Sequence, residues 1–175
     1  GDGKISTVRL DENGVPVNGV SLISNQGSGP NKSRQEGPHA HGVYFDKTNT
    51  RLLVPDLGLD KVLVYPFDAA TSKLGDSLPP LTTAPGAGPR HMAFSPGEKH
   101  AYVINELDCT VLTVSMDGLK GLGTVKTLPD GFAGSNTTAE IEASADGRFV
   151  YASNRGHDSI AVFSRDAETG ALRLL

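Results

Sequence analysis

The chain has no tryptophan, one cysteine and two methionines, and only 6% of its 175 residues are aromatic. The single cysteine, Cys109, excludes an internal disulfide framework. No apolar run approaches the roughly 20 residues that a membrane-spanning helix needs, so we expect no membrane partner. Basic residues do not cluster, and the formal net charge is -4, which argues against a nucleic-acid partner. What remains is the composition of an ordinary globular domain.

Turn-forming residues are plentiful, with 21 glycines and 11 prolines, and they separate short segments in which apolar and polar residues alternate. No segment has a helical period, so the pattern predicts an all-β fold. Residues 25–36 are rich in Gly, Ser, Asn and Pro, which predicts a loop too polar to pack on its own. The expected strands are 4–10, 20–23, 42–45, 51–54, 61–65, a segment near Leu81, 91–94, 100–104, 110–114, 124–128, 140–143, 149–152 and 159–163.

One pattern occurs three times, beginning at residues 37, 88 and 137. Asp56, Asn105 and Asn154 share one column of this register and are 49 residues apart each time. A fixed period of this length, with four short strands in each copy, is typical of the blades of a β-propeller. We expect one propeller domain made of trailing strands and a loop (1–36), two blades (37–87 and 88–136) and a nearly complete blade (137–175). A second column holds His41, His91 and Glu140. A third column holds Leu57, Glu106 and Arg155.

The predicted blades do not close a ring, because a propeller needs about four to eight of them. An open arc leaves apolar faces of its terminal blades uncovered, and such faces favour association. We therefore expect the ring to be completed by missing blades, in a chain of about twice this length, or by another chain.

Equivalent positions on successive blades converge near the axis of a propeller, which brings distant residues together. Guanidinium groups bind phosphate or carboxylate through forked hydrogen bonds, and a carboxylate between two of them has a lowered pKa. An imidazole moves protons near neutral pH. Two arginines, a carboxylate and a histidine in one cleft suffice to open or close a lactone ring. The candidates are catalytic His41 and Glu106, anion-binding Arg90 and Arg155, and His91 and Glu140 as channel-lining support.

Each candidate also has a structural interpretation. Glu106 and Arg155 form an inter-blade salt bridge under this alternative, and His91 is a hydrogen-bonded structural residue. His39 and His41 have the spacing of a metal pair, but few further ligands are in reach, so we expect no metal and no cofactor. Cys109 has no matched histidine, which argues against a nucleophile. Asp56, Asn105 and Asn154 recur in every copy and are expected to cap turns.

Several strings resemble the seven-bladed β-propeller lactonase family, whose members include bacterial 6-phosphogluconolactonases and fungal carboxy-cis,cis-muconate cyclase. The resemblance covers nearly the whole chain from Gly37 onward. It implies a seven-bladed ring that hydrolyses 6-phosphogluconolactone to 6-phosphogluconate, a step of the pentose phosphate pathway, without a metal. It also implies a site of one histidine, two arginines and one glutamate, which fall on His41, Arg90, Arg155 and Glu106. The strings are Gly37-Pro-His-Ala-His-Gly, Gly88-Pro-Arg-His-Met-Ala-Phe, Tyr102-Val-Ile-Asn-Glu-Leu, Ala139-Glu-Ile and Tyr151-Ala-Ser-Asn-Arg-Gly-His-Asp-Ser-Ile.

Three alternatives stay open beside a hydrolase of a small anionic lactone. The first is a cyclase that forms or opens the lactone of a muconate-type acid. The second is a non-catalytic propeller that binds a ligand or protein. The third is a metal-dependent lactonase of another propeller family. The cytoplasm is the expected compartment by default.

Overall fold

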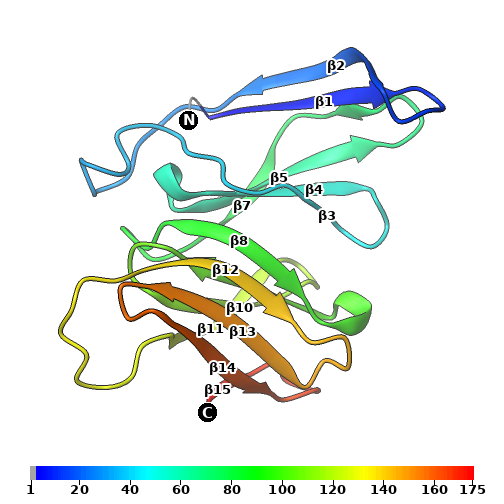
Figure 1. Cartoon of the computed structure of the whole chain (residues 1–175). Helices are drawn as coiled ribbons and strands as arrows, with labels where there is room; N and C mark the ends of the chain where they lie inside the picture. Colours follow the sequence, from blue (N-terminus) through cyan, green and yellow to red (C-terminus); the bar gives the residue numbers. More distant parts are fainter. Residues whose placement is uncertain (1–2) are drawn as a thin grey trace.

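The computed structural model describes residues 3–175, so the first two residues of the predicted 1–36 segment lie outside the described part. This part contains strands and two short 3-10 turns but no α-helix, which confirms the all-β prediction. It also has no helix long and apolar enough to cross a bilayer. The first two strands, β1 (Lys4–Leu10) and β2 (Pro16–Ser24), form an antiparallel pair, seen at the top of Figure 1.

Three antiparallel sheets follow in chain order and stack below this pair, as a propeller's blades do (Figure 1). We call them the first, second and third blades. The first contains β3 (Tyr44–Phe45), β4 (Arg51–Asp56), β5 (Lys61–Asp68), β6 (Lys73–Leu74) and β7 (Leu78–Thr82). The second contains β8 (Pro89–Phe94), β9 (His100–Asn105), β10 (Thr110–Ser115) and β11 (Lys120–Lys126). The third contains β12 (Thr137–Ala143), β13 (Phe149–Arg155), β14 (Ser159–Arg165) and β15 (Leu172–Leu174).

Several strands differ from the prediction: β2, β8 and β12 begin two to four residues early, and β15 was not predicted. The outer strands of the first and second blades also differ. In the first blade the outer strand is divided, because β6 pairs with the end of β5 at Phe67 whereas β7 pairs with its beginning, from Lys61 to Val64. In the second blade β11 begins at Lys120, four residues before the predicted start. It ends before Thr127, whose backbone N–H and hydroxyl both donate to the carbonyl of Cys109 at 3.0 Å. The predicted segment 124–128 was therefore placed too late.

The turn after the second strand of each blade has the same backbone conformation. Asp60, Cys109 and Asp158 are 49 residues apart, and all three have left-handed φ angles, of 53°, 57° and 52°. Most non-glycine residues avoid this region, so a shared exception indicates a turn set by the fold. The three blades thus share this turn, but the residues beside it differ in type: Leu57, Glu106 and Arg155 occupy the same position in the three copies.

The recurring column before this turn has the predicted structural role. Asp56 caps the 3-10 turn η1 (Leu57–Leu59) by accepting a hydrogen bond from the Leu59 N–H. Asn105 and Asn154 are buried, and each donates across its hairpin, to the hydroxyl of Thr110 at 2.9 Å and of Ser159 at 3.3 Å. These side chains hold the turns rather than face a substrate.

Asp60 joins three parts of the chain. Its buried carboxylate accepts hydrogen bonds from the Gln35 side chain at 2.7 Å, from the Gly86 N–H at 2.6 Å and from the Gly88 N–H at 2.9 Å. Gln35 lies before the first blade, and the two glycines lead into the second. The carboxylate therefore ties the 25–36 loop to two blades.

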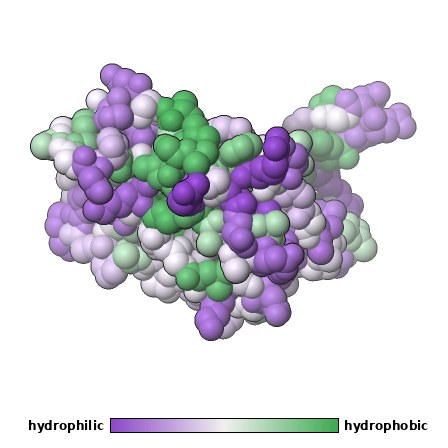
Figure 2. Space-filling model, turned by 90° about the horizontal axis from the view of Figure 1, so that it is seen from below, coloured by the Kyte–Doolittle hydropathy of each residue, from purple (hydrophilic) through white to green (hydrophobic). Residues whose placement is uncertain are grey.

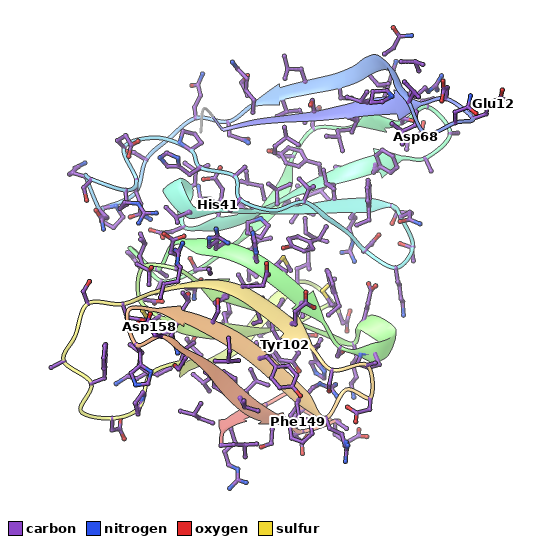
Figure 3. The ribbon with its side chains drawn as sticks, viewed as in Figure 1. Glu12, His41, Asp68, Tyr102, Phe149 and Asp158 are labelled. Carbon is purple, nitrogen blue, oxygen red and sulfur yellow. The ribbon has the colours of Figure 1, made fainter. Side chains whose placement is uncertain are left out.

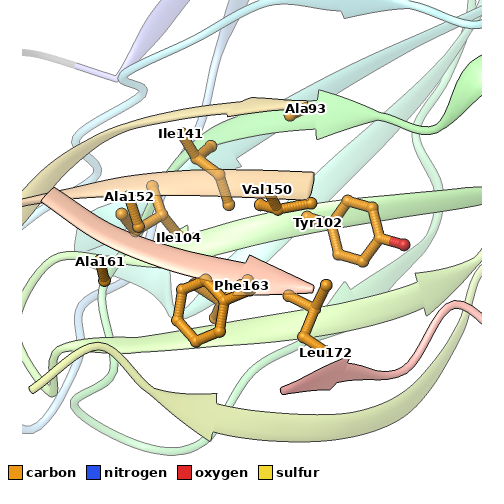
Figure 4. Packing of buried hydrophobic residues seen from close by; sticks show 10 residues of the cluster. Ala93, Tyr102, Ile104, Ile141, Val150, Ala152, Ala161, Phe163 and Leu172 are labelled. Atoms are coloured by element: carbon orange, nitrogen blue, oxygen red, sulfur yellow. The ribbon is translucent and has the colours of Figure 1, made fainter. Parts of the chain in front are cut away.

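The core lies between neighbouring blades. Between the second and third, Tyr102 and Ile104 pack against Ile141, Val150 and Phe163, all 1% exposed or less (Figure 4). Burying one such side chain contributes about 1.5 to 3 kcal/mol. The hydroxyl of Tyr102 is also satisfied, since it donates to the carbonyl of residue 170 at 3.0 Å. Blade-to-blade packing thus fixes how the turns of successive blades line up.

Both terminal sheets expose apolar side chains, as expected for an open arc. On β1 and β2, Leu10 is 61% exposed and Leu22 is 69% exposed. On the last blade, Ile160 is 59% exposed, and Figure 2, which views the molecule from that side, shows an apolar patch among polar groups. Apolar side chains are thus exposed on both of the sheets at the ends of the arc.

Candidate active site

Glu106 lies at the centre of the candidate site, directly after β9. It is only 3% exposed. Its N–H donates to the carbonyl of Gly88 at 2.7 Å, and its carbonyl accepts from the N–H of Thr138 at 3.2 Å. Gly88 precedes the inner strand of the same blade, and Thr138 belongs to the inner strand of the next. The backbone therefore holds Glu106 between two inner strands.

Three arginines surround the Glu106 carboxylate. Arg90 donates through Nε to Oε2 at 2.9 Å, and Arg155 places Nη2 3.3 Å from Oε1. Arg34 donates through Nη2 to the same Oε1 at 2.5 Å. The structure thus brings together Glu106, Arg90 and Arg155, as the register predicted, and it adds a third guanidinium.

Glu106 is ionised at neutral pH. Burial raises the pKa of its carboxyl group, but the hydrogen bond and charge of Arg34 and the charges of Arg155 and Arg90 outweigh burial. The net result is a pKa below the ordinary value of 4.5. This agrees with the expectation for a carboxylate held by guanidinium groups. Such a group accepts a proton or orients water more readily than it donates a proton.

Arg90, His91 and Glu140 form a connected group behind Glu106. Arg90 Nη1 donates to the carbonyl of Ala139 at 3.1 Å and lies 3.2 Å from His91 Nε2. His91 Nδ1 lies 2.8 Å from Glu140 Oε1. A carboxylate only accepts, so Nδ1 carries the proton in this pair. His91 and Glu140 therefore contact each other, and they support Arg90 rather than Glu106.

His41 lies at the same end of the molecule as these turns. Figure 3 shows it at the end where Asp158 lies, and Phe149 lies at the other end. Its N–H donates to the carbonyl of Pro55 at 3.0 Å, which fixes the segment against β4. Within residues 3–175 no hydrogen bond holds its imidazole. Burial and the charge of Arg90 lower the pKa of His41 below 6.5, and Glu106 opposes them in part. Its imidazole is neutral at pH 7.

The other predicted histidine, His39, has a structural contact. Its N–H donates to the Asp56 carboxylate at 2.8 Å, and its Nε2 lies 3.1 Å from Glu36 Oε1. Across residues 3–175, no three His, Cys, Asp or Glu side chains are grouped so as to hold a metal ion. Cys109 is buried, and burial raises the pKa of its thiol, which is the opposite of what a thiolate nucleophile needs.

Arg34 was missed because the sequence pattern predicted that its loop does not pack. The loop is in fact anchored by Gln35, which is fully buried and donates through Nε2 to the carbonyl of Leu57 at 2.8 Å as well as to Asp60. Gln35 also accepts from the N–H of Asn31 at 3.0 Å. A buried polar group has to be hydrogen-bonded, and this one is. Gln35 therefore fixes the backbone that carries Arg34.

A separate hollow lies elsewhere on the described surface. A cavity of about 600 Å³ lies at the opposite ends of the strands, lined among others by Lys47, Glu98 and Asp117. Arg51 and Asp46, which also line it, already form an ion pair at 2.9 Å. No candidate residue borders this cavity, so the chemistry of the site rests on the Glu106 cluster.

Comparison with known proteins agrees with the geometry. All of residues 1–175 match the family described as "Lactonase, 7-bladed beta-propeller". A 6-phosphogluconolactonase of Bacillus subtilis is 38% identical over 97% of this chain and 49% of its own length. A crystal structure from Lactobacillus plantarum has a TM-score of 0.92 at 34% identity, covering 99% of this chain and 50% of that one.

A second solved structure, the periplasmic gluconolactonase of Pseudomonas aeruginosa, has a TM-score of 0.88 at 32% identity. It matches 98% of this chain and 49% of its own. The chain thus spans about half the length of the relatives it matches. With its stacked antiparallel sheets and its match along the whole sequence, the chain belongs to the seven-bladed β-propeller lactonase family.

Proposed function

We propose that this chain hydrolyses a small anionic sugar lactone, with 6-phospho-D-glucono-1,5-lactone as the first candidate substrate. The observation that carries the proposal is the buried, ionised Glu106 among three guanidinium groups, with a neutral imidazole at the same end of the arc. Relatives named 6-phosphogluconolactonase support this substrate.

The proposed mechanism divides the work between positive charge and proton transfer. Arginine N–H groups bind the substrate anion and polarise the lactone carbonyl. Water attacks this carbonyl carbon while His41 takes one of its protons and Glu106 orients the attacking molecule. The bond between the carbonyl carbon and the ring oxygen then breaks, and the ring oxygen receives from the His41 imidazolium the proton that came from water. The products are a carboxylic acid and an alcohol, and no step needs a metal or a cofactor.

The direct test is turnover of three lactones by the purified protein. We expect 6-phosphogluconolactone to be hydrolysed fastest, gluconolactone more slowly, and a carboxymuconolactone slowest. Preferred turnover of the muconate-type ring would instead support the cyclase alternative. A rate abolished by a chelator and restored by metal would support the metal-dependent alternative. A folded protein that turns over none of the three would leave the non-catalytic propeller.

The pH profile tests the role of His41. Its lowered pKa keeps the base form populated at neutral pH, so kcat/KM is expected to be flat there and to fall as pH drops through this pKa, below 6.5. The profile is best measured with gluconolactone, because a substrate phosphate group itself titrates near pH 6. His41→Gln should lower the rate and remove this fall. An unchanged profile in the variant would assign the titration to another group.

We also propose that further blades or another chain complete the ring around this site. The seven-bladed family and the doubled length of the relatives support this proposal. The mass of the assembly in solution, measured by light scattering, tests whether copies of this chain associate. The cytoplasm stays the predicted compartment, although one structural relative is described as periplasmic.

A further inference from the structure

The three arginines around Glu106 are not equivalent. Arg90 is 19% exposed, and its guanidinium is occupied by Glu106, by the carbonyl of Ala139 and by His91. Few of its N–H groups remain for another anion. Arg90 is therefore placed to hold Glu106 in position rather than to receive a ligand.

Arg34 and Arg155 are more open and share one acceptor. They are 42% and 50% exposed, and Nη2 of each lies against the same oxygen, Oε1 of Glu106. Arg155 also donates to the carbonyl of Thr138 at 3.1 Å. The Arg34 guanidinium donates to no other acceptor within residues 3–175. Two guanidinium groups that meet at one oxygen lie close together, and most of their N–H groups are unused.

The cluster around Glu106 has an excess of positive charge. Three guanidinium groups face two carboxylates, those of Glu106 and Glu140, and Glu140 is joined to Arg90 through His91. The uncompensated positive charge is therefore at Arg34 and Arg155. A phosphate group carries close to two negative charges at pH 7 and three acceptor oxygens, and guanidinium groups match it with forked pairs of hydrogen bonds.

We propose that Arg34 and Arg155 together bind the phosphate group of the substrate, and that Arg34 gives the site its preference for phosphorylated over unphosphorylated sugar acids and lactones. The lactone part of this statement rests on the proposed function. The phosphate-binding site itself does not rest on the proposed function, because it follows from the contacts of Arg34 and Arg155.

The loop that carries Arg34 is built to present it. Gln35, the next residue, is fully buried, and its side chain is held by the carbonyl of Leu57 and by Asp60. The Arg34 N–H donates to the carbonyl of Asn31 at 3.1 Å. The Arg34 side chain is therefore positioned before a ligand arrives, and less side-chain entropy is lost on binding than from a free loop.

Binding measured by calorimetry at pH 7.5 tests the proposal without requiring turnover. The probes are inorganic phosphate, 6-phosphogluconate and gluconate. We expect Arg34→Gln to weaken binding of both phosphate-containing probes at least about tenfold and to leave gluconate binding unchanged. Arg34→Lys keeps the charge but loses the forked pair of N–H donors, so its affinity for the phosphate-containing probes should lie between those of the wild type and Arg34→Gln. Lys32→Gln is the matched control, since Lys32 is an exposed lysine two residues away and loses the same charge.

Each contrary outcome is specific. Equal loss of gluconate and 6-phosphogluconate affinity in folded Arg34→Gln overturns the proposal, as does equal weakening by Lys32→Gln, which indicates general attraction only. The proposal also fails if the wild-type chain binds no phosphate. If the protein binds phosphate through Arg34 but hydrolyses no lactone, the proposed function fails and the phosphate-binding site stands. If 6-phosphogluconolactone and gluconolactone are hydrolysed at equal rates and Arg34→Gln changes neither rate, the phosphate-binding proposal fails and the proposed lactonase function stands.

Discussion

Glu106→Gln is expected to lower kcat/KM for lactone hydrolysis about 100-fold, the size of effect that follows when the attacking water is no longer held in position. Glutamine keeps the size of the side chain and one acceptor oxygen. It carries no charge with which to orient the attacking water, and it no longer balances the three guanidinium groups that meet at the carboxylate. The measurement is steady-state hydrolysis of 6-phosphogluconolactone and of gluconolactone. Both rates should fall, because the lost group acts on the ring and not on the phosphate.

The loss of rate has to be separated from a loss of folding. Removing one member of a buried ion cluster is destabilising, and the partly exposed arginines moderate the effect, so we expect a cost of about 1 to 3 kcal/mol. Urea unfolding gives the folded fraction under assay conditions. Glu142→Gln is the matched control, since Glu142 is an exposed residue of β12. A rate that falls only in proportion to the folded fraction would show that Glu106 is structural, as an inter-blade salt bridge requires.

Gly58→Ala is expected to lower the free energy of unfolding by about 3 kcal/mol, near the upper end for overpacking. Gly58 lies in η1, and a Cβ there would collide with the backbone carbonyl oxygen of Gly37 and lie 3.0 Å from the backbone nitrogen of His39. These atoms cannot move aside easily, because the Leu57 N–H donates to the carbonyl of His39 at 2.9 Å. The strain reaches the segment that ends at His41, so turnover should fall as well.

Gly123→Ala provides the comparison. Gly123 lies in β11, and a Cβ at this position meets nothing within 4 Å. Alanine also restricts the unfolded chain more than glycine does, so this change should be neutral or stabilising by up to about 1 kcal/mol. Chemical denaturation of the two variants measures the difference. Similar unfolding free energies for both would mean that the backbone around Gly37 yields more readily than its hydrogen bonds indicate.

The repeat explains why most of the site was readable from the sequence. Glu106 and Arg155 occupy one column of a 49-residue period, and stacking of successive blades converts that spacing into contact. Arg90 follows from the same register, because it is the second residue of the inner strand of the blade that carries Glu106. The alternation of apolar residues likewise located the strands. It placed the starts of the inner strands β8 and β12 two and three residues late, and its other errors include outer strands such as β6 and β11, which pair with one neighbour only.

Arg34 was not predictable in this way. It lies before the first blade, outside the repeat, so no other residue occupies its column. Its position depends on the burial of Gln35, and burial of an amide in a polar segment leaves no periodic mark. The first blade also has Leu57 where the next two carry Glu106 and Arg155. Only the three-dimensional arrangement shows that a side chain from the preceding loop joins the charged cluster.

The Asp60 carboxylate has a consequence for how this arc comes apart. Blades in a row can open one at a time when only nearest-neighbour packing joins them. Here one side chain binds Gln35 from the preceding loop and the amide hydrogens of Gly86 and Gly88 from the segment that leads into the following blade. Fraying of the first blade would release all three bonds at once. The amides of Gly86 and Gly88 should therefore exchange with deuterium only in a shared opening event that also frees the Arg34 loop, so two blades and their loop behave as one cooperative unit.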